Sequence, residues 1–496
     1  MQLISISFFL FVGVTYVAYR LFPARLRWAA LLLASLIFYL CAGIVSFIFI
    51  LFFTLSSFFA ALFLSRHDGQ GSKFVIGADK RQTKRGGAFI YSFTVCILVT
   101  LWIALRESST VAGLGISFYS LRVISYLCDV KRGRIAPEKN FFKYALFVTF
   151  FPLAFLGPVA LYRDMKETLY SGKIACGEDV SRSLLRITAG VFKKVVIANA
   201  LILPLEQIVI QPDTYSGAYV LFLLVLYSAE IYCDFSGGID ICIGIAGLFS
   251  VSLSENFNKP FSSLSLREFW NRWHISLGEW FERYVFYPIS LSRPMQKVSR
   301  LCRKRFGTRI GKRLPLYAAT LFTWTLTGLW HGREGHFVAW GLVNGVLVLL
   351  SQETTRPLSR LCDRYPAWRD SLIRRVIARA RVFLIIGAVR LLDVYKSLPL
   401  TVGMLSTVFY DLGSYRSLLS GGVLELVDPS SLALVLLSLL AIYLFDKKEN
   451  RAEEISKKPF AAALCIMLLT VSTFLFGTYG QGFDASDFIY SKFNGG

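Results

Sequence analysis

Residues 267–288 read REFWNRWHISLGEWFERYVFYP, a polar and aromatic block within a chain that is otherwise apolar. Of the 496 residues, 55% are hydrophobic and only 17% are charged, whereas about 25% of the residues in typical soluble domains are charged. Apolar runs near 20 residues long, which are typical of transmembrane helices, recur along the sequence. The sequence therefore predicts an all-α polytopic membrane protein, and the block at 267–288 requires a place within it.

The basic residues indicate how the chain crosses the membrane. The formal net charge is +22, which is typical of nucleic-acid-binding proteins or of membrane proteins with basic cytoplasmic loops. The Lys and Arg residues cluster between apolar runs, most densely at 65–87, 293–313 and 356–381. This distribution favours membrane topology and no nucleic-acid partner. We expect about ten to thirteen transmembrane or re-entrant helices, including helical hairpins at 28–64 and 315–352.

The block at 267–288 is predicted to be helical. Its aromatic residues recur at three- and four-residue steps. Glu268 and Arg272 are four residues apart, so on a helix their opposite charges can neutralise each other. We expect a re-entrant helix at 265–290, because a polar element at membrane depth needs protein or water around it. A helix that lies in the headgroup layer, anchored by its tryptophans, fits the pattern equally well.

A second polar segment reads LFTWTLTGLWHGREGHFVAWG at 321–341. His331 lies roughly 24 Å along a helix from Pro315, and a neutral imidazole can act as a general base. A lone histidine of this kind is more often structural, satisfied by a carbonyl at a helix end. The spacing of His331, Glu334 and His336 matches neither H-E-x-x-H nor H-x-x-E-H, so no metal site is expected.

A third segment, AEIYCDFSGGIDICIGIAGL at 229–248, places carboxylates within an apolar run. Glu230 and Asp234 are one helical turn apart, and Asp240 follows a Gly-Gly pair. Buried carboxylates near a helix break line a cavity or pair with basic groups. A proton-coupled transporter would show the same feature, so this segment leaves carrier and enzyme open.

Seven motifs, taken together, resemble the membrane-bound O-acyltransferase superfamily and specifically its bacterial alginate O-acetyltransferase-like branch. Weaker likeness extends to RVFLIIGAVR at 381–390, while the stretch WFERYVFYPISLS at 280–292 departs from the run that is common in relatives. In chain order the motifs are GISFYSLRVISYLCDVKRG (115–133), FPLAFLGPVALYRDM (151–165), GVFKKVVIAN (190–199), YCDFSGGIDICIG (232–244), ENFNKPF (255–261), REFWNRWHISL (267–277) and LTGLWHG (326–332).

The resemblance implies a fold and a reaction. Members of this superfamily enclose a tunnel between a cytoplasmic and an extracytoplasmic opening. Acetyl from cytoplasmic acetyl-CoA is moved across the bacterial inner membrane to hydroxyls of a polysaccharide such as alginate or peptidoglycan, often through a periplasmic, SGNH-type partner. The implied segments are N-terminal transmembrane helices at 1–110, a catalytic core with the helix 265–290 at 111–350, and C-terminal transmembrane helices at 351–496.

The resemblance also implies roles for individual residues. His331 is the expected catalytic base at the narrow part of the tunnel, and His274 is the second histidine, which orients substrate or assists proton transfer. Asn271 is a candidate oxyanion donor. The remaining expected tunnel residues are Trp330, Trp270, Trp273, Asp234 and Asp240.

Two questions stay open at the level of sequence. Arg303, Lys304 and Arg305 are candidates for docking the phosphates of coenzyme A, although a role in topology alone explains them equally well. The alternatives for the function are transfer of D-alanyl or another acyl group from a carrier protein to an envelope polymer, and a non-enzymatic transporter.

Overall fold

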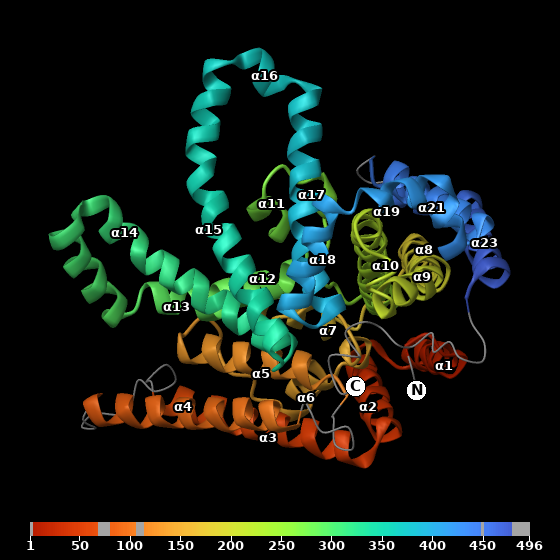
Figure 1. The fold of residues 1–496 in the computed structure, drawn as a ribbon. Helices are drawn as coiled ribbons and strands as arrows, with labels where there is room; N and C mark the ends of the chain where they lie inside the picture. Colours follow the sequence, from red (N-terminus) through yellow and green to blue (C-terminus); the bar gives the residue numbers. More distant parts are fainter. Residues whose placement is uncertain (1–2, 68–79, 106–113, 448–450, 479–496) are drawn as a thin grey trace. The chain divides into compact units, whose positions relative to one another are not determined.

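The computed structural model describes residues 3–67, 80–105, 114–447 and 451–478, which are mostly helical and contain no β-strand (Figure 1). Most of the basic connection at 65–87 therefore lies outside the described residues. The chain divides into two compact units that interleave along the sequence. The first comprises Met1–Val195, Asp234–Ser254 and Asn450–Gly496, and the second Val196–Cys233 and Glu255–Glu449. The sequence segments with boundaries near 110 and 350 stay a prediction.

The first unit is a set of helices packed around phenylalanines. The predicted segment 28–64 forms two helices, α2 and α3, which are separated at Gly43, where φ is +132°. That they form a hairpin stays a prediction. The ring centroids of Phe38 and Phe151 lie 6.0 Å apart, as do those of Phe151 and Phe249. The helices of this unit, besides the C-terminal part of α10, are α1 (Ile6–Leu21), α2 (Arg27–Ala42), α3 (Ile44–His67), α4 (Lys80–Leu105), α5 (Ile116–Lys131), α6 (Phe141–Thr149), α7 (Tyr162–Leu169), α8 (Gly177–Phe192), α22 (Arg451–Ser456) and α23 (Pro459–Phe476).

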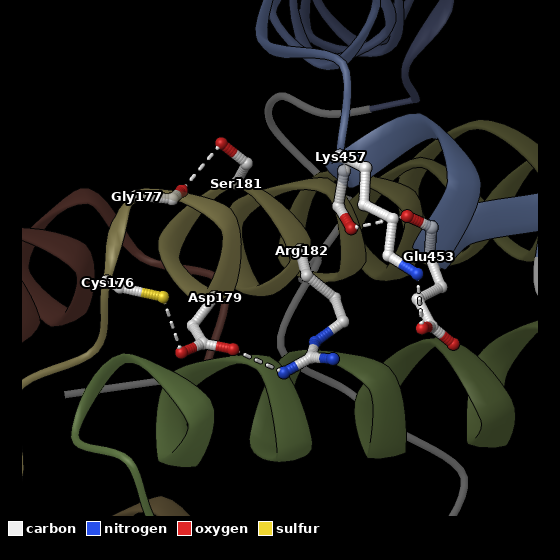
Figure 2. Close-up of polar contacts among 8 residues, drawn as sticks. Cys176, Gly177, Asp179, Ser181, Arg182, Glu453 and Lys457 are labelled. Carbon is white, nitrogen blue, oxygen red and sulfur yellow. Dashed lines mark hydrogen bonds and ion pairs between the residues drawn. The ribbon is translucent and has the colours of Figure 1, made fainter.

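A small polar network marks the start of α8 (Figure 2). The thiol of Cys176 donates a hydrogen bond of 2.9 Å to Asp179, which also accepts one of 2.7 Å from Arg182. On α22, Lys457 pairs with Glu453 at 2.8 Å. An acidic residue in the first turn suits the positive end of the helix dipole. These exposed pairs contribute little stability by themselves, and they indicate that α8 begins in water.

The crossing of α8 with α10 (Ala218–Leu248) uses glycines to bring two backbones together. A Cβ added to Gly190 would lie 2.5 Å from the carbonyl oxygen of Gly237, and one added to Gly244 would lie 2.8 Å from the carbonyl oxygen of Ser183. Small residues at such crossings permit close packing where helices gain no hydrophobic stabilisation against lipid. Beyond α8 the chain continues through a π-helical segment, Lys193–Ala198, into α9 (Asn199–Ile210).

The second unit is built around two helical hairpins. The predicted hairpin at 315–352 is confirmed: the later part of α14 packs antiparallel to α15, and the chain reverses at Gly332. α15 and α17 form the next hairpin through the short α16 (Figure 1). The helices from α11 onward are α11 (Leu266–Trp270), α12 (Ile275–Phe281), α13 (Tyr287–Ser290), α14 (Arg293–His331), α15 (Gly335–Arg364), α16 (Pro366–Asp370), α17 (Leu372–Tyr395), α18 (Leu398–Tyr410), α19 (Leu412–Ser417), α20 (Val423–Leu426) and α21 (Pro429–Lys447).

The helices confirm a multi-pass membrane protein. In the described part of the chain, seven helices are long and apolar enough to cross a membrane, or eight if the bent pair Leu412–Leu426 and Pro429–Ile442 forms one span. The described part also contains three shorter apolar helices, Ile6–Leu21, Phe141–Leu153 and Leu398–Tyr410. The expected number of ten to thirteen counts transmembrane and re-entrant helices together, and it stays a prediction.

The α8–α10 crossing leads to a prediction about stability. Gly190→Ala places a methyl group 2.5 Å from the Gly237 carbonyl oxygen and 2.9 Å from Cγ1 of Ile241. We expect this overpacking to lower the free energy of unfolding by about 1–3 kcal/mol, measured as thermal unfolding of the purified protein in detergent. Gly13→Ala in α1 is the matched control, because its methyl group would meet no atom within 4 Å. Equal stability of the two variants would contradict the close crossing.

Candidate active site

His274 lies in a break between two short helices, so the prediction of one continuous helix at 265–290 is wrong. α11 ends at Trp270 and α12 begins at Ile275, and His274 between them has φ +48° and ψ 52°. The regular spacing of aromatic residues continues through this break, which is why the sequence did not reveal it.

Backbone hydrogen bonds between the residues around His274 and the loop at 256–258 explain the break. The N–H of Ile275 donates to the carbonyl oxygen of Asn256, and the N–H of Asn258 donates to that of Arg272, each at 3.0 Å. The side-chain oxygen of Asn256 also accepts from the N–H of Ser276 at 3.0 Å. These bonds replace those that a continuous helix would have formed. They hold His274 in a left-handed conformation that is uncommon for residues with a β-carbon and is characteristic of functional sites.

The predicted pairing of Glu268 with Arg272 is confirmed. Their side chains form an ion pair at 2.7 Å. Glu268 also accepts a hydrogen bond of 2.8 Å from the backbone N–H of Leu264. Ser265 caps α11, because its hydroxyl accepts from the N–H of Glu268 at 3.2 Å. The pair therefore fastens the short helix that precedes the His274 loop, without requiring the helix to continue.

The structure brings His274 and His331 together around one tryptophan. His331 is the last residue of α14, which ends because Gly332 has an extended backbone. The ring of Trp330 lies 6.2 Å from that of His274 and 5.0 Å from that of His331, measured between centroids. On its other side, His331 lies 5.1 Å from the ring of Trp340. Two histidines that are 57 residues apart in sequence therefore share one site.

The environment of His274 keeps its imidazole neutral. The side chain is buried, with 4% of the residue exposed, and it lies outside the helices long enough to span a membrane. Burial, together with the neighbouring His331, lowers the pKa of His274 well below the ordinary histidine value. A neutral imidazole can donate one hydrogen bond and accept another, which suits orienting a reactant, whereas the lowered pKa makes His274 a weak base.

Three tryptophans form one wall beside His331. The ring centroids of Trp270 and Trp324 are 4.9 Å apart, those of Trp270 and Trp340 are 5.7 Å apart, and those of Trp324 and Trp340 are 6.1 Å apart. Trp270 and Trp330, both expected near the catalytic base, therefore lie in the cluster that contains His331. An aromatic wall of this kind excludes water from the atoms that it covers.

Trp273 faces Arg390, which was not among the predicted site residues. The guanidinium carbon of Arg390, in α17, lies 3.9 Å from the centroid of Trp273 and 5.4 Å from that of Phe269. Only 3% of Arg390 is exposed, and cation–π contacts are strongest when the cation is desolvated. Because Trp273 directly precedes His274, the contact with Arg390 helps to hold the loop that carries His274 in place. The signal in the sequence was an arginine within the apolar run RVFLIIGAVR.

Asp234 and Asp240 are held in ion pairs within the first unit. Lys194 Nζ lies 2.5 Å from Asp234 Oδ1, and both side chains are only 1% exposed. Asp240 is paired with Arg186 at 3.0 Å and with Lys193 at 2.9 Å. Of the two arrangements expected for buried carboxylates, the structure has the pairing with basic groups. A tunnel role for either aspartate stays a prediction.

The remaining candidates lie at exposed positions. Asn271 follows α11 and is exposed, outside the buried cluster of histidines and tryptophans. Arg303, Lys304 and Arg305 are exposed on the first part of α14. No three His, Cys, Asp or Glu side chains gather around a possible metal position in the part of the chain that the structure describes.

A comparison with protein families agrees with this arrangement. The model of the membrane-bound O-acyltransferase family matches residues 31–302, which is more than half of the chain. The chain belongs to the membrane-bound O-acyltransferase family. The matched part of this O-acyltransferase chain includes the His274 loop and ends before His331. The assignment of His331 therefore rests on the LTGLWHG motif and on its place beside His274.

Curated relatives carry related names. The chain is 33% identical to the probable alginate O-acetylase AlgI of Azotobacter vinelandii over 253 residues, 49% of this chain and 47% of that protein. It is 28% identical to the peptidoglycan O-acetyltransferase of Helicobacter pylori over 284 residues, 51% of each chain. It is 26% identical to the teichoic acid D-alanyltransferase of Bacillus subtilis over 274 residues, 53% of this chain and 66% of that protein. The matches to the alginate and peptidoglycan proteins span about half the length of those relatives.

The contact between Arg390 and Trp273 can be tested by a double-mutant cycle. Arg390→Met and Trp273→Leu each remove one side of the cation–π contact, so the two changes should be non-additive by about 2 kcal/mol in the free energy of unfolding. Thermal unfolding in detergent measures this coupling. Arg375→Met, an exposed position on the same helix, should show additivity with Trp273→Leu. Additivity at Arg390 as well would rule out the supporting contact.

Proposed function

We propose that the chain is a membrane O-acyltransferase that moves acetyl groups from cytoplasmic acetyl-CoA across the bacterial inner membrane for O-acetylation of an extracytoplasmic polysaccharide. The observation that carries this proposal is the pairing of His274 and His331 around Trp330 in a chain of this family. The acetyl group and the glycan acceptor follow the names of the alginate and peptidoglycan relatives.

The two histidines suit transfer of an acyl group from a thioester to a hydroxyl. In the proposed reaction, His331 takes the proton of the acceptor hydroxyl while its oxygen bonds to the acetyl carbonyl carbon. Collapse of the tetrahedral intermediate breaks the carbon–sulfur bond, and the leaving thiolate takes the proton from the imidazolium. His274 orients the reactants or assists this proton transfer. The imidazole returns in the second step the proton that it takes in the first, so one imidazole serves both steps.

The length of α14 suits a reaction between compartments. His331 lies 18 residues beyond Arg313 in the same helix, which is about 27 Å and close to the thickness of the hydrocarbon core. The basic residues at 293–313 favour the cytoplasm for the Arg313 end. His331 would then lie near the outer half of the membrane, reached by the acyl donor through a tunnel and by an acceptor hydroxyl, or that of a periplasmic SGNH-type partner, from outside.

Two alternatives involve the donor. The likeness to teichoic acid D-alanyltransferases favours D-alanyl transfer from a carrier protein as the second candidate function. Docking of the coenzyme A phosphates by Arg303, Lys304 and Arg305 is the remaining hypothesis about the donor site, and it is tested together with the surface described in the next subsection.

Replacing His331 tests the catalytic assignment. His331→Ala removes the proposed base, and we expect ester-linked acetate on surface polysaccharide to fall by about 10²–10⁴-fold in rate. The measurement is acetate released by mild alkali from cells that contain equal amounts of each protein. Glu334→Gln, an exposed change in the same loop, should leave the acetate unchanged. Equal acetate in wild type and His331→Ala would contradict the assignment of His331 as the catalytic base. Release of D-alanine in place of acetate would support D-alanyl transfer.

A pair of variants separates the chemical role of His274 from its backbone role. Asparagine tolerates the left-handed conformation of this position, whereas alanine does not. If the imidazole is required, His274→Asn and His274→Ala should both lose acetyl transfer, although only His274→Ala should also lose thermal stability. Full activity of His274→Asn would show that the position serves only the turn.

A further inference from the structure

The first part of α14 folds back on itself into a basic hairpin, defined here as residues 293–313. The helix is interrupted at Gly307, where φ is +82°, and Figure 1 shows this bend in the first part of α14. The Ser299 hydroxyl donates to the carbonyl oxygen of Gly311 at 2.7 Å and accepts from Arg303 at 3.1 Å. A Cβ at Gly311 would lie 2.5 Å from the backbone nitrogen of Arg303. The two arms are therefore in direct contact.

The charge of the basic hairpin is entirely positive. It contains nine Lys or Arg residues and no acidic residue. All of them except Arg313 are exposed, and Arg313 binds Glu353 of α15. Four of the exposed residues follow the 4-3-4 spacing that places side chains on one helix face. The four are Arg293, Lys297, Arg300 and Lys304.

Large apolar side chains lie between these charges. Leu301 is 67% exposed, Phe306 is 56% exposed and Ile310 is 48% exposed. Such side chains are unfavourable in water, and the surrounding charges are unfavourable in hydrocarbon. The boundary between headgroups and acyl chains satisfies both, because apolar side chains enter the acyl region while Lys and Arg reach the phosphates.

Arg313, the last residue of the basic hairpin, lies at a membrane depth that suits the boundary between headgroups and acyl chains. Both Arg313 and Tyr317 bind the carboxylate of Glu353. Glu353 belongs to the last turn of the apolar part of α15, Gly335–Thr355, which is long enough to span a membrane. The hairpin thus begins where the neighbouring span ends.

We propose that the basic hairpin is a binding surface for the anionic phospholipid headgroups of the leaflet on its side of the membrane. Its charges are spread along two exposed arms, which matches an array of lipid phosphates better than the single phosphate cluster of one coenzyme A molecule. Arg303, one of the three donor-docking candidates, is engaged in closing the hairpin through Ser299. The proposal is independent of the acyl-transfer reaction.

The test titrates dihexanoyl phosphatidylglycerol or dihexanoyl phosphatidylcholine into the full-length protein, purified in a neutral detergent, and follows the midpoint of thermal unfolding. Phosphatidylglycerol should raise the midpoint of the wild type, phosphatidylcholine should not, and about 0.5 M salt should weaken the effect. A variant with Lys297, Arg300, Lys304 and Arg305 replaced by Gln should need at least about fivefold more phosphatidylglycerol for half of the shift. These changes leave Ser299, Arg303 and Gly311 in place, and an unchanged midpoint without lipid shows that the variant is folded.

Two further variants make the result specific. Replacing Arg360, Arg364, Arg369 and Arg375 by Gln removes the same charge from another exposed basic segment and should preserve the response to phosphatidylglycerol. Leu301→Ser with Phe306→Ser keeps every charge and should weaken the response. The same response in the wild type and the four-Gln hairpin variant overturns the proposal, as does equal loss in the control. A shift with coenzyme A but not with phosphatidylglycerol, lost in the hairpin variant, would assign the surface to the acyl donor instead.

Discussion

Two backbone hydrogen bonds hold the loop around His274, and the candidate active site depends on them. They join Asn256 to Ile275 and Asn258 to Arg272, and so they replace bonds that a helix would have made within itself. A left-handed residue with a β-carbon is unfavourable by about 1–2 kcal/mol, which this loop must overcome. In return, His274 is placed beside Trp330, at the end of a long helix from a later part of the chain.

The sequence was sufficient to predict the elements whose hydrophobic pattern is long and regular. The hairpin at 315–352 was predicted correctly, because an apolar run that is too long for one span must turn back, and because the basic clusters mark its ends. The membership of the family followed from short motifs in a fixed order. His274 and His331 were both chosen from these motifs, and they do share one site.

The errors have a common physical origin. Spacing reports which face a residue would take on a helix, but it does not report whether a partner elsewhere in the chain offers a better hydrogen bond. The break before Ile275 depends on the loop at 256–258, which the aromatic period of the block cannot reveal. The contact of Arg390 with Trp273 and the pairing of Lys194 with Asp234 likewise join residues that are distant in sequence or on different helices.

The carboxylate of Asp240 forms ion pairs with Arg186 and with Lys193, which lie nearly two helical turns apart. Gly190, between these two cations, is in backbone contact with the helix that carries Asp240. Rotation of helix α8 about its own axis, or sliding along the end of α10, would therefore break one of the two ion pairs. We therefore expect α8 and the end of α10 to move as one body.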